Sequence, residues 1–256
     1  MSNIAKAFSH FKAFIGFVTG GDGGIDKTKE FIREMLRAGA DMVEIGIPFS
    51  DPVAEGPVIQ EASIRALSAG TTVEKLFALV ADLRKETSAP LAFMTYLNPV
   101  FHYGYDAFFK RASDVGLDGI IIPDLPFEEQ DEVKETASKY GIDLISLIAP
   151  TSELRVKEIA KASSGFIYLV SSMGVTGIRR EITADIGAIA AAIKSVTKTP
   201  VAVGFGIHTP AQAAAMANSA DGVIVGSAIV KIIAEHGDAA GPHIYNYVKE
   251  MKDAVQ

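Results

Sequence analysis

The chain has 256 residues, of which 48% are hydrophobic and 21% are charged, which is the composition of a folded globular protein with a large core. It has no cysteine, which excludes a disulfide framework and thiol catalysis, and its five histidines lack the spacing of a zinc site. A net charge of −7 argues against a nucleic-acid surface, and no apolar run reaches the roughly 18 residues that span a bilayer, so we expect a cytoplasmic protein that binds neither nucleic acid nor membrane.

Eight short apolar runs alternate with longer segments of helical periodicity along the chain. Because the runs are nearly continuous, they are typical of strands that are covered on both faces. The predicted strands span residues 13–20, 41–47, 90–96, 118–124, 142–150, 165–171, 200–206 and 221–227. Apolar residues spaced three and four apart predict helices over residues 26–39, 73–86, 105–116, 128–141, 152–163, 184–196 and 210–219.

Strict alternation of strand and helix predicts a parallel sheet with right-handed crossovers. Eight such units in 256 residues match the size of a closed (β/α)8 TIM barrel. An open, doubly wound sheet is the alternative, but no GxGxxG follows the first predicted strand. No linker or change of composition divides the chain, so we expect one α/β domain over residues 1–256 with a short N-terminal helix.

The segment EIGIPFSDPVAEGP, residues 44–57, places a carboxylate, Glu44, at the end of an apolar strand. A buried charge costs free energy, so chemistry explains this residue better than packing does. In a parallel barrel, the C-terminal ends of the strands hold the catalytic groups. The sequence therefore predicts a catalytic carboxylate here, and the loop that follows adds Ser50, Asp51 and Glu55 as further candidates.

Glycine-containing turns follow the last two predicted strands, Gly204-Phe205-Gly206 and Gly226-Ser227. Glycine lets the backbone approach a ligand closely, and a helix that starts near Ser227 would direct unpaired N–H groups at an anion. Either turn alone is ordinary, but in many barrels this pair of loops binds phosphate. The two turns together therefore predict a phosphate site, to which the loop after the sixth strand would add Gly174, Thr176 and Gly177.

The segment LNPVFHYGY, residues 97–105, is unusually apolar for a barrel loop. Loops normally expose polar side chains, so this cluster either packs beneath the following helix or contacts a partner. The residues alone do not decide between these alternatives.

Seven segments together resemble the tryptophan synthase alpha subunit family along nearly the whole chain. They are FVTGGD (17–22), EIGIPFSDPVAEGPVIQ (44–60), YLNPVFHYG (96–104), PDLP (123–126), SSMGVTG (171–177), GFGI (204–207) and GSAIVK (226–231). The resemblance implies a carbon–carbon lyase of tryptophan biosynthesis, which splits indole-3-glycerol phosphate by a retro-aldol reaction into indole and glyceraldehyde 3-phosphate. It also implies docking of a pyridoxal-phosphate-dependent β subunit on the loops after strands two and three, in an alpha2-beta2 complex. We expect no cofactor and no metal in this chain itself.

The resemblance implies three catalytic residues. Glu44 matches the glutamate that delivers a proton to indole C3 and acts as base for the hydroxyl on the departing carbon. Glu55 stands where the family usually has an aspartate that handles the indole N–H, a departure that keeps the carboxylate. Tyr168 matches a tyrosine near the catalytic glutamate.

The resemblance also implies the residues that bind the substrate. Phe17 and Tyr96 match residues that line the indole pocket. Without the resemblance, simple barrel packing is the favoured explanation of Phe17, Tyr96 and Tyr168. Thr176 matches a threonine that helps to close the site. The positions that match the family's phosphate-binding residues are Gly177, Gly206, Gly226 and Ser227.

Three other functions remain open at this stage. A free-standing lyase would release indole without an obligate partner. A non-catalytic barrel would bind the phosphate ligand and regulate a partner, and Glu55 in place of aspartate is the feature that leaves this alternative open. Another phosphate-handling barrel enzyme, such as a sugar-phosphate isomerase, is disfavoured by the segment EIGIPFSDP.

Overall fold

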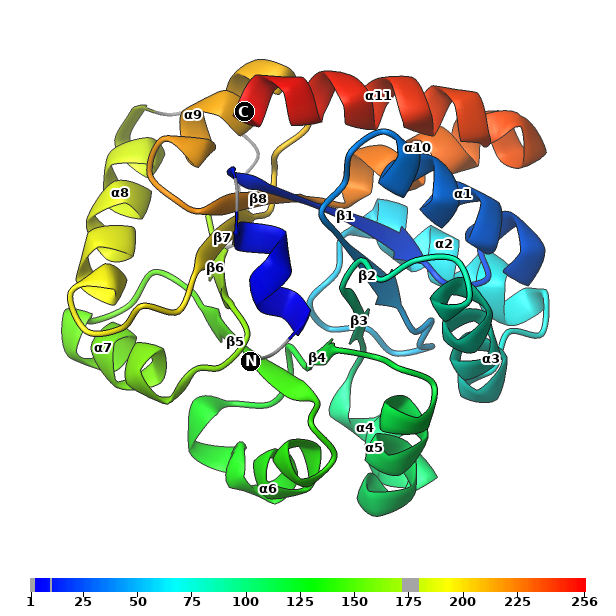
Figure 1. Ribbon diagram of the computed structural model, residues 1–256, viewed down its shortest axis with the longest axis horizontal. Helices are drawn as coiled ribbons and strands as arrows, with labels where there is room; N and C mark the ends of the chain where they lie inside the picture. Colours follow the sequence, from blue (N-terminus) through cyan, green and yellow to red (C-terminus); the bar gives the residue numbers. More distant parts are fainter. Residues whose placement is uncertain (1–2, 10, 172–179) are drawn as a thin grey trace.

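The computed structural model describes residues 3–9, 11–171 and 180–256. Eight parallel strands close into a barrel in chain order, and β8 pairs with β1 (Figure 1). The strands are β1 (Ala13–Thr19), β2 (Met42–Gly46), β3 (Leu91–Met94), β4 (Gly119–Ile121), β5 (Asp143–Ile148), β6 (Ile167–Val170), β7 (Val201–Gly204) and β8 (Gly222–Val225). The predicted (β/α)8 barrel is therefore confirmed, and the doubly wound alternative is wrong.

Helices surround the barrel and include all seven that the periodicity predicts. They are α1 (Ile25–Arg37), α2 (Pro57–Ser68), α3 (Val73–Arg84), α4 (Leu97–Tyr103), α5 (Tyr105–Asp114), α6 (Asp131–Lys139), α7 (Glu153–Ala162), α8 (Arg180–Lys194), α9 (Pro210–Ala217), α10 (Ser227–His236) and α11 (Ala240–Val255). Short 3-10 helices are η1 (Asn3–Phe8), η2 (Phe127–Glu129) and η3 (Gly237–Ala239). In the described part of the chain, no helix is long and apolar enough to cross a membrane.

Side chains of each strand alternate between two apolar clusters. In β1, Ile15 and Phe17 belong to the cluster inside the barrel, whereas Phe14 and Val18 belong to the cluster between the strands and the helices. Both faces of the strands are therefore buried, which is why the strands have apolar sequences without polar alternation. The alternation also shows which strand residues face the barrel interior, where a ligand can be enclosed.

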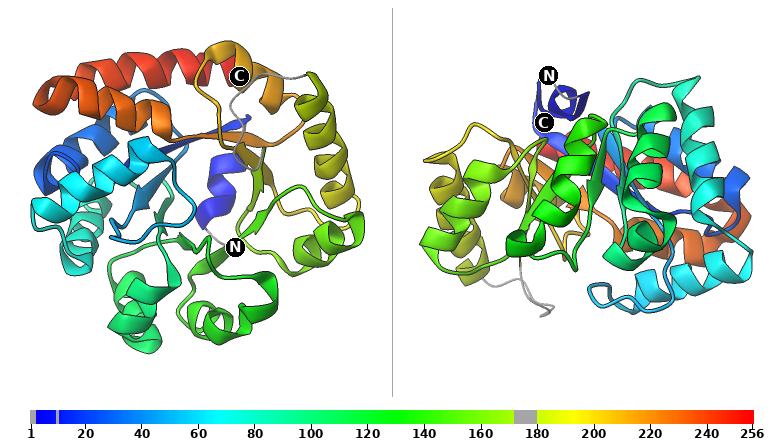
Figure 2. Two further views of the ribbon diagram at one scale, coloured as in Figure 1. Left: turned by 180° about the vertical axis from the view of Figure 1, so that it is seen from behind. Right: turned by 90° about the horizontal axis from the view of Figure 1, so that it is seen from below.

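The two ends of the barrel differ. We call the end at which the strands begin the floor, and the end at which they finish the mouth. Helix η1 crosses the floor of the barrel (Figure 2). Ile4 of this helix is fully buried, and the ring of Phe8 lies 5.8 Å from the ring of Phe166. Gly119 makes room for this helix, because a Cβ there would lie 2.7 Å from Cδ1 of Ile4. The floor is thus filled by side chains, and catalytic groups of such barrels lie at the mouth.

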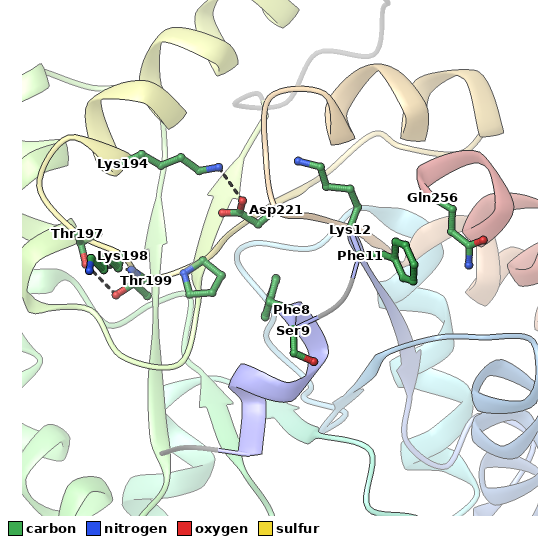
Figure 3. Close-up of a pocket in the computed structure, with 11 residues that line it drawn as sticks. Phe8, Ser9, Phe11, Lys12, Lys194, Thr197, Lys198, Thr199, Asp221 and Gln256 are labelled. Atoms are coloured by element: carbon green, nitrogen blue, oxygen red, sulfur yellow. Dashed lines mark hydrogen bonds and ion pairs between the residues drawn. The ribbon is translucent and has the colours of Figure 1, made fainter.

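An open cavity of about 710 Å³ lies beside η1 at the floor (Figure 3). Its lining includes Phe8, Lys12, Lys194, Lys198 and Asp221. Lys194 is paired with Asp221 at 2.7 Å. These residues precede or begin strands, so the cavity lies at the opposite end of the barrel from the predicted site.

Candidate active site at the barrel mouth

Glu44 is the central residue of β2, and its side chain faces the barrel interior. It follows the alternation of Met42, which belongs to the interior cluster, and it is in register with Phe17 on β1. The prediction that Glu44 ends the strand is wrong by two residues, because Ile45 and Gly46 continue the ladder. The carboxyl group consequently lies deeper in the barrel than the sequence suggested.

The carboxyl group of Glu44 is fully buried, and neither oxygen has a hydrogen-bond partner among the described residues. Burial raises the pKa of Glu44 to about 8, because the ionised form loses its solvation in an apolar interior. Buried polar atoms without partners are rare in folded proteins and need an explanation, which a bound ligand supplies. A neutral carboxyl group with both oxygens free can donate a proton and take one back.

Tyr168 on β6 also belongs to the interior cluster. Burial raises the pKa of Tyr168 well above its ordinary value, and the charge of nearby Glu44 raises it further, so the phenol keeps its proton. Gly204 on β7 makes room for this ring, because a Cβ there would lie 2.4 Å from the Tyr168 hydroxyl oxygen. The structure therefore brings Tyr168 and Glu44 within electrostatic reach across the barrel interior.

Loop two, residues 47–56 between β2 and α2, is held by the hydroxyl group of Tyr96. This oxygen accepts hydrogen bonds from the backbone N–H groups of Val53 (3.1 Å) and Ala54 (2.9 Å). The same hydroxyl group donates a hydrogen bond to the carboxylate of Glu55. One donor and two acceptor sites are thereby all used. The resemblance gave Tyr96 only as a wall of the pocket, whereas the structure shows that it also orients Glu55.

Burial raises the pKa of Glu55 to about 7, Asp124 raises it slightly, and backbone N–H groups of loop two oppose this rise. Asp124 follows β4 and accepts a hydrogen bond of 2.9 Å from the N–H group of Leu97, the first residue of α4. Asp124 was not among the residues predicted from the sequence. It had the signal that identified Glu44, namely a carboxylate in a predicted barrel strand near the C-terminal end.

The turn after β7 has an unusual backbone. Phe205 and Gly206 both have positive φ angles, 73° and 74°. This conformation costs a non-glycine residue about 1–3 kcal/mol and is found most often at functional sites. Ser171 holds the turn by donating a hydrogen bond of 2.6 Å to the carbonyl group of Phe205. A Cβ on Gly206 would meet no atom of the described residues within 4 Å, so these residues leave the space beside this glycine open to a ligand.

Helix α10 begins at Ser227, as predicted, and Gly226 at its N-cap provides no side-chain hydrogen bond. The first N–H groups of the helix therefore receive no capping side chain from the N-cap residue in the described part of the chain, an arrangement that favours an anion. Gly226 also touches the predicted pocket wall, because a Cβ there would lie 3.3 Å from Cβ of Phe17. The predicted contributions of Gly174, Thr176 and Gly177 lie outside the described residues.

The predicted residues that the structure describes gather around the mouth. Three face the interior from strands (Phe17, Glu44, Tyr168), two meet in the loop layer (Glu55, Tyr96), and three border the helix start and the turn after β7 (Gly206, Gly226, Ser227). A deep proton donor, a second carboxylate and a backbone anion site can together act on a small phosphate ester that has a proton-accepting carbon.

Comparisons with known proteins agree with this arrangement. A sequence model of the tryptophan synthase alpha chain matches residues 5–256. The tryptophan synthase alpha chain of Lacticaseibacillus casei is 51% identical over 255 residues, covering 100% of this chain and 96% of the relative.

Solved structures show the same similarity. Tryptophan synthase subunit alpha from Legionella pneumophila str. Paris has a TM-score of 0.90 at 36% identity, covering 100% of this chain and 98% of that chain. A chain from the tryptophan synthase a2b2 complex of Pyrococcus furiosus has a TM-score of 0.84 at 35% identity, covering 95% of this chain and 98% of that chain. With its sequence matched from residue 5 to its last residue, this protein belongs to the tryptophan synthase alpha chain family.

Proposed function

We propose that this chain cleaves indole-3-glycerol phosphate into indole and glyceraldehyde 3-phosphate, with Glu44 as general acid and base and Glu55 as the group that holds the indole N–H. The alpha chain family consists of lyases of tryptophan biosynthesis, and this chain matches it over nearly its full length. The observation that carries the assignment of Glu44 is a fully buried carboxyl group that has no hydrogen-bond partner among the residues that the structure describes.

The reaction needs one proton to be delivered and one to be removed. Glu44, whose pKa of about 8 keeps it mostly neutral at pH 7, donates its proton to C3 of the indole ring. Glu55, ionised in part at this pH, accepts a hydrogen bond from the ring N–H and stabilises the positive charge that develops there. The Glu44 carboxylate then takes the proton of the hydroxyl group on the adjacent carbon. The carbon–carbon bond breaks, its electrons restore the indole ring, and the aldehyde forms.

The neutral phenol of Tyr168 supports this cycle. It remains protonated beside Glu44, because its pKa lies well above the ordinary value. A neutral neighbour allows the carboxyl group to alternate between its two protonation states without a competing charge. Glu44 ends the cycle with the proton that it had at the start, so no cofactor or metal takes part in this scheme.

Release of indole from indole-3-glycerol phosphate by the purified chain tests the proposed function. We expect indole and glyceraldehyde 3-phosphate in equal amounts, at a rate that rises when a β subunit is added. A rate that a β subunit leaves unchanged would favour the free-standing lyase. Ligand binding without any cleavage, even with a β subunit present, would favour the non-catalytic regulatory barrel.

The cytoplasmic location of this chain remains a prediction. Fractionation of cells that produce the chain would check it.

We further propose that a pyridoxal-phosphate-dependent β subunit docks on this chain beside α4. The similar chain from Pyrococcus furiosus belongs to an a2b2 complex. The apolar segment that follows β3 forms this short helix. Some of its side chains pack into the core and others are exposed, so both expected alternatives, packing and partner contact, apply to it. Val100 is fully buried, whereas Phe101 is 66% exposed. The ring of Phe101 lies 5.9 Å from the ring of Tyr105, so the two form an aromatic surface of the kind that partners cover.

Phe101→Asp should weaken association with a β subunit by about 10- to 100-fold, because it places a charge in an apolar contact. Phe11→Asp is the matched control, since Phe11 is similarly exposed (69%) but lies at the floor. Analytical ultracentrifugation with a β subunit measures the association, and circular dichroism checks the fold. Unfolding of the Phe101→Asp chain would show that this residue serves packing instead.

Gly206→Leu should raise the KM for substrate by about tenfold or more, because the side chain fills the space through which a phosphate reaches the backbone. Gly141→Leu is the matched control, because the φ of Gly141 (73°) is close to that of Gly206 (74°) and Gly141 lies at the floor. Among the residues that the structure describes, a Cβ on Gly141 would also meet no atom within 4 Å. Both variants carry the same backbone strain. Steady-state kinetics and calorimetry with inorganic phosphate make the comparison. Equal effects of the two substitutions on KM would exclude Gly206 from the phosphate site.

A further inference from the structure

Thr19, the last residue of β1, has a buried hydroxyl group that the scheme above does not use. The residue is 1% exposed, and its Oγ1 has no hydrogen-bond partner among the described residues. It continues the alternation of Ile15 and Phe17, both of which belong to the interior cluster. A buried hydroxyl group without a partner destabilises a fold, so this one is expected to meet a ligand in the barrel.

The register between β1 and β2 places this hydroxyl group relative to the acid. Phe17 is in register with Glu44, and Thr19 is in register with Gly46. Thr19 therefore lies one interior layer closer to the mouth than Glu44, on the neighbouring strand. The Phe17 ring rests against Gly46, since a Cβ there would lie 2.6 Å from Cζ of that ring. Unpartnered oxygens of two residues thus share one wall of the interior with the Phe17 ring.

The position of β1 in the barrel shows where Thr19 lies between Glu44 and the proposed phosphate site. β1 lies between β2, which carries Glu44, and β8, which leads to the start of α10. Gly226 at that start is close enough to Phe17 that an added Cβ would lie 3.3 Å from the Phe17 Cβ. Thr19 therefore stands between the carboxyl group and the proposed phosphate site. A substrate that reaches from one to the other must pass this hydroxyl group.

We infer that the Thr19 hydroxyl group binds the hydroxyl group on the middle carbon of the substrate's glycerol chain. This inference rests on the proposed function. The substrate carries one hydroxyl group on the carbon bonded to the indole, which reacts with Glu44, and a second one carbon closer to the phosphate. The order of these groups along the substrate matches the order of Glu44, Thr19 and the start of α10 around the barrel. Thr19 is thereby a residue that determines specificity, since it favours substrates that carry the second hydroxyl group.

The test compares indole-3-glycerol phosphate with its analogue that lacks the middle hydroxyl group. The parent chain should cleave the analogue with a kcat/KM roughly 5- to 100-fold lower, because the Thr19 hydroxyl group is then left buried and unpaired. Thr19→Val keeps the shape of the side chain and removes its hydroxyl group. It should lower kcat/KM for the full substrate by a similar factor and leave that for the analogue within about twofold of the parent value. Thr19→Ser, which keeps the hydroxyl group, should retain most of the activity on the full substrate.

Stability separates this role from a structural one. Because the Thr19 hydroxyl group has no partner within residues 3–9, 11–171 and 180–256, Thr19→Val should unfold at the same or a higher urea concentration than the parent. A structural hydroxyl group would give the opposite result. Equal losses on both compounds in Thr19→Val would overturn the inference. So would a parent chain that cleaves both compounds equally well, a result that needs no variant to fold. A parent that cleaves neither compound would overturn the proposed function, and the inference with it.

Discussion

Glu44→Gln is expected to lower kcat for cleavage of indole-3-glycerol phosphate by at least about 10²- to 10⁴-fold, the usual effect of removing a general acid and base. Glutamine keeps the size of the side chain but neither delivers a proton to C3 nor accepts one from the hydroxyl group. Rapid-mixing measurement of indole release gives kcat, and calorimetry with inorganic phosphate checks that the ligand site is intact. Near-normal turnover with intact phosphate binding would exclude Glu44 from this role.

The same substitution should stabilise the unliganded chain at alkaline pH. Folding raises the pKa of Glu44 from an ordinary value of 4.5 to about 8. The unfolded chain therefore loses this proton first, and the parent becomes less stable as the pH rises from about 4.5 to about 8. Glutamine has no proton to lose. The free energy of unfolding of Glu44→Gln should therefore equal that of the parent below pH 4.5 and exceed it by on the order of 3–5 kcal/mol above pH 8. Urea unfolding at several pH values measures it, and a gain that does not change with pH would contradict the burial of an ionisable group.

Glu55→Gln should nearly abolish cleavage, with a loss of about 10²-fold or more, whereas Glu55→Asp should keep or raise the rate. The amide no longer stabilises charge at the indole nitrogen, but the shorter carboxylate still does if loop two follows it. Glu61→Gln is a suitable control, because Glu61 is an exposed glutamate on α2, six residues further along the chain. Steady-state kinetics of the three variants make the comparison. Unchanged cleavage by Glu55→Gln would transfer the role to another group, such as Asp51.

The pH dependence of kcat/KM should distinguish the two carboxyl groups. Activity should rise with pH as Glu55 ionises, around its pKa of about 7, and fall as Glu44 loses its proton, around its pKa of about 8. Glu55→Asp should move only the rising limb, since the setting of Glu44 is unchanged. A shift of the falling limb alone would reverse the assignment of the two groups.

The barrel was predictable because burial on both faces leaves a simple trace in the sequence. All eight strands coincide with predicted apolar runs, but each run extends beyond its ladder. Ile47 and Ile122, for example, are buried at the mouth although they lie outside the strands. Apolar sequence reports burial and not strand pairing, so it overestimates the length of strands.

Three helices, α2, α4 and α11, were not predicted. Each has a proline in its first turn (Pro57, Pro99 and Pro242), but so does α9, which begins at Pro210 and was predicted, so proline alone does not explain the difference. Proline interrupts a helix in its interior, but the first turn has no use for the missing N–H group. In α4 this residue made an apolar helix resemble a loop.

The contacts that organise the site were not accessible from sequence in the same way. The hydroxyl group of Tyr96 meets residues more than 40 positions earlier in the chain, and Asp124 meets Leu97 from another loop. Such contacts depend on how loops pack above the barrel, which no periodicity reports. The resemblance to a family supplied the identities of several site residues, but not the hydrogen bonds among them.

Because side chains fill the floor of the barrel, the interior is open to solvent at the mouth. In the part of the chain that the structure describes, Ile4, Phe8 and Phe166 pack where the strands begin. Passage of substrate or products through that end would require η1 to detach. Substrate entry and the departure of both products then share one passage. Turnover becomes sensitive to whatever stands at that passage, and α4, with its exposed Phe101, lies beside it. A protein bound beside α4 would control the entry of substrate and the release of products without contacting any reacting atom.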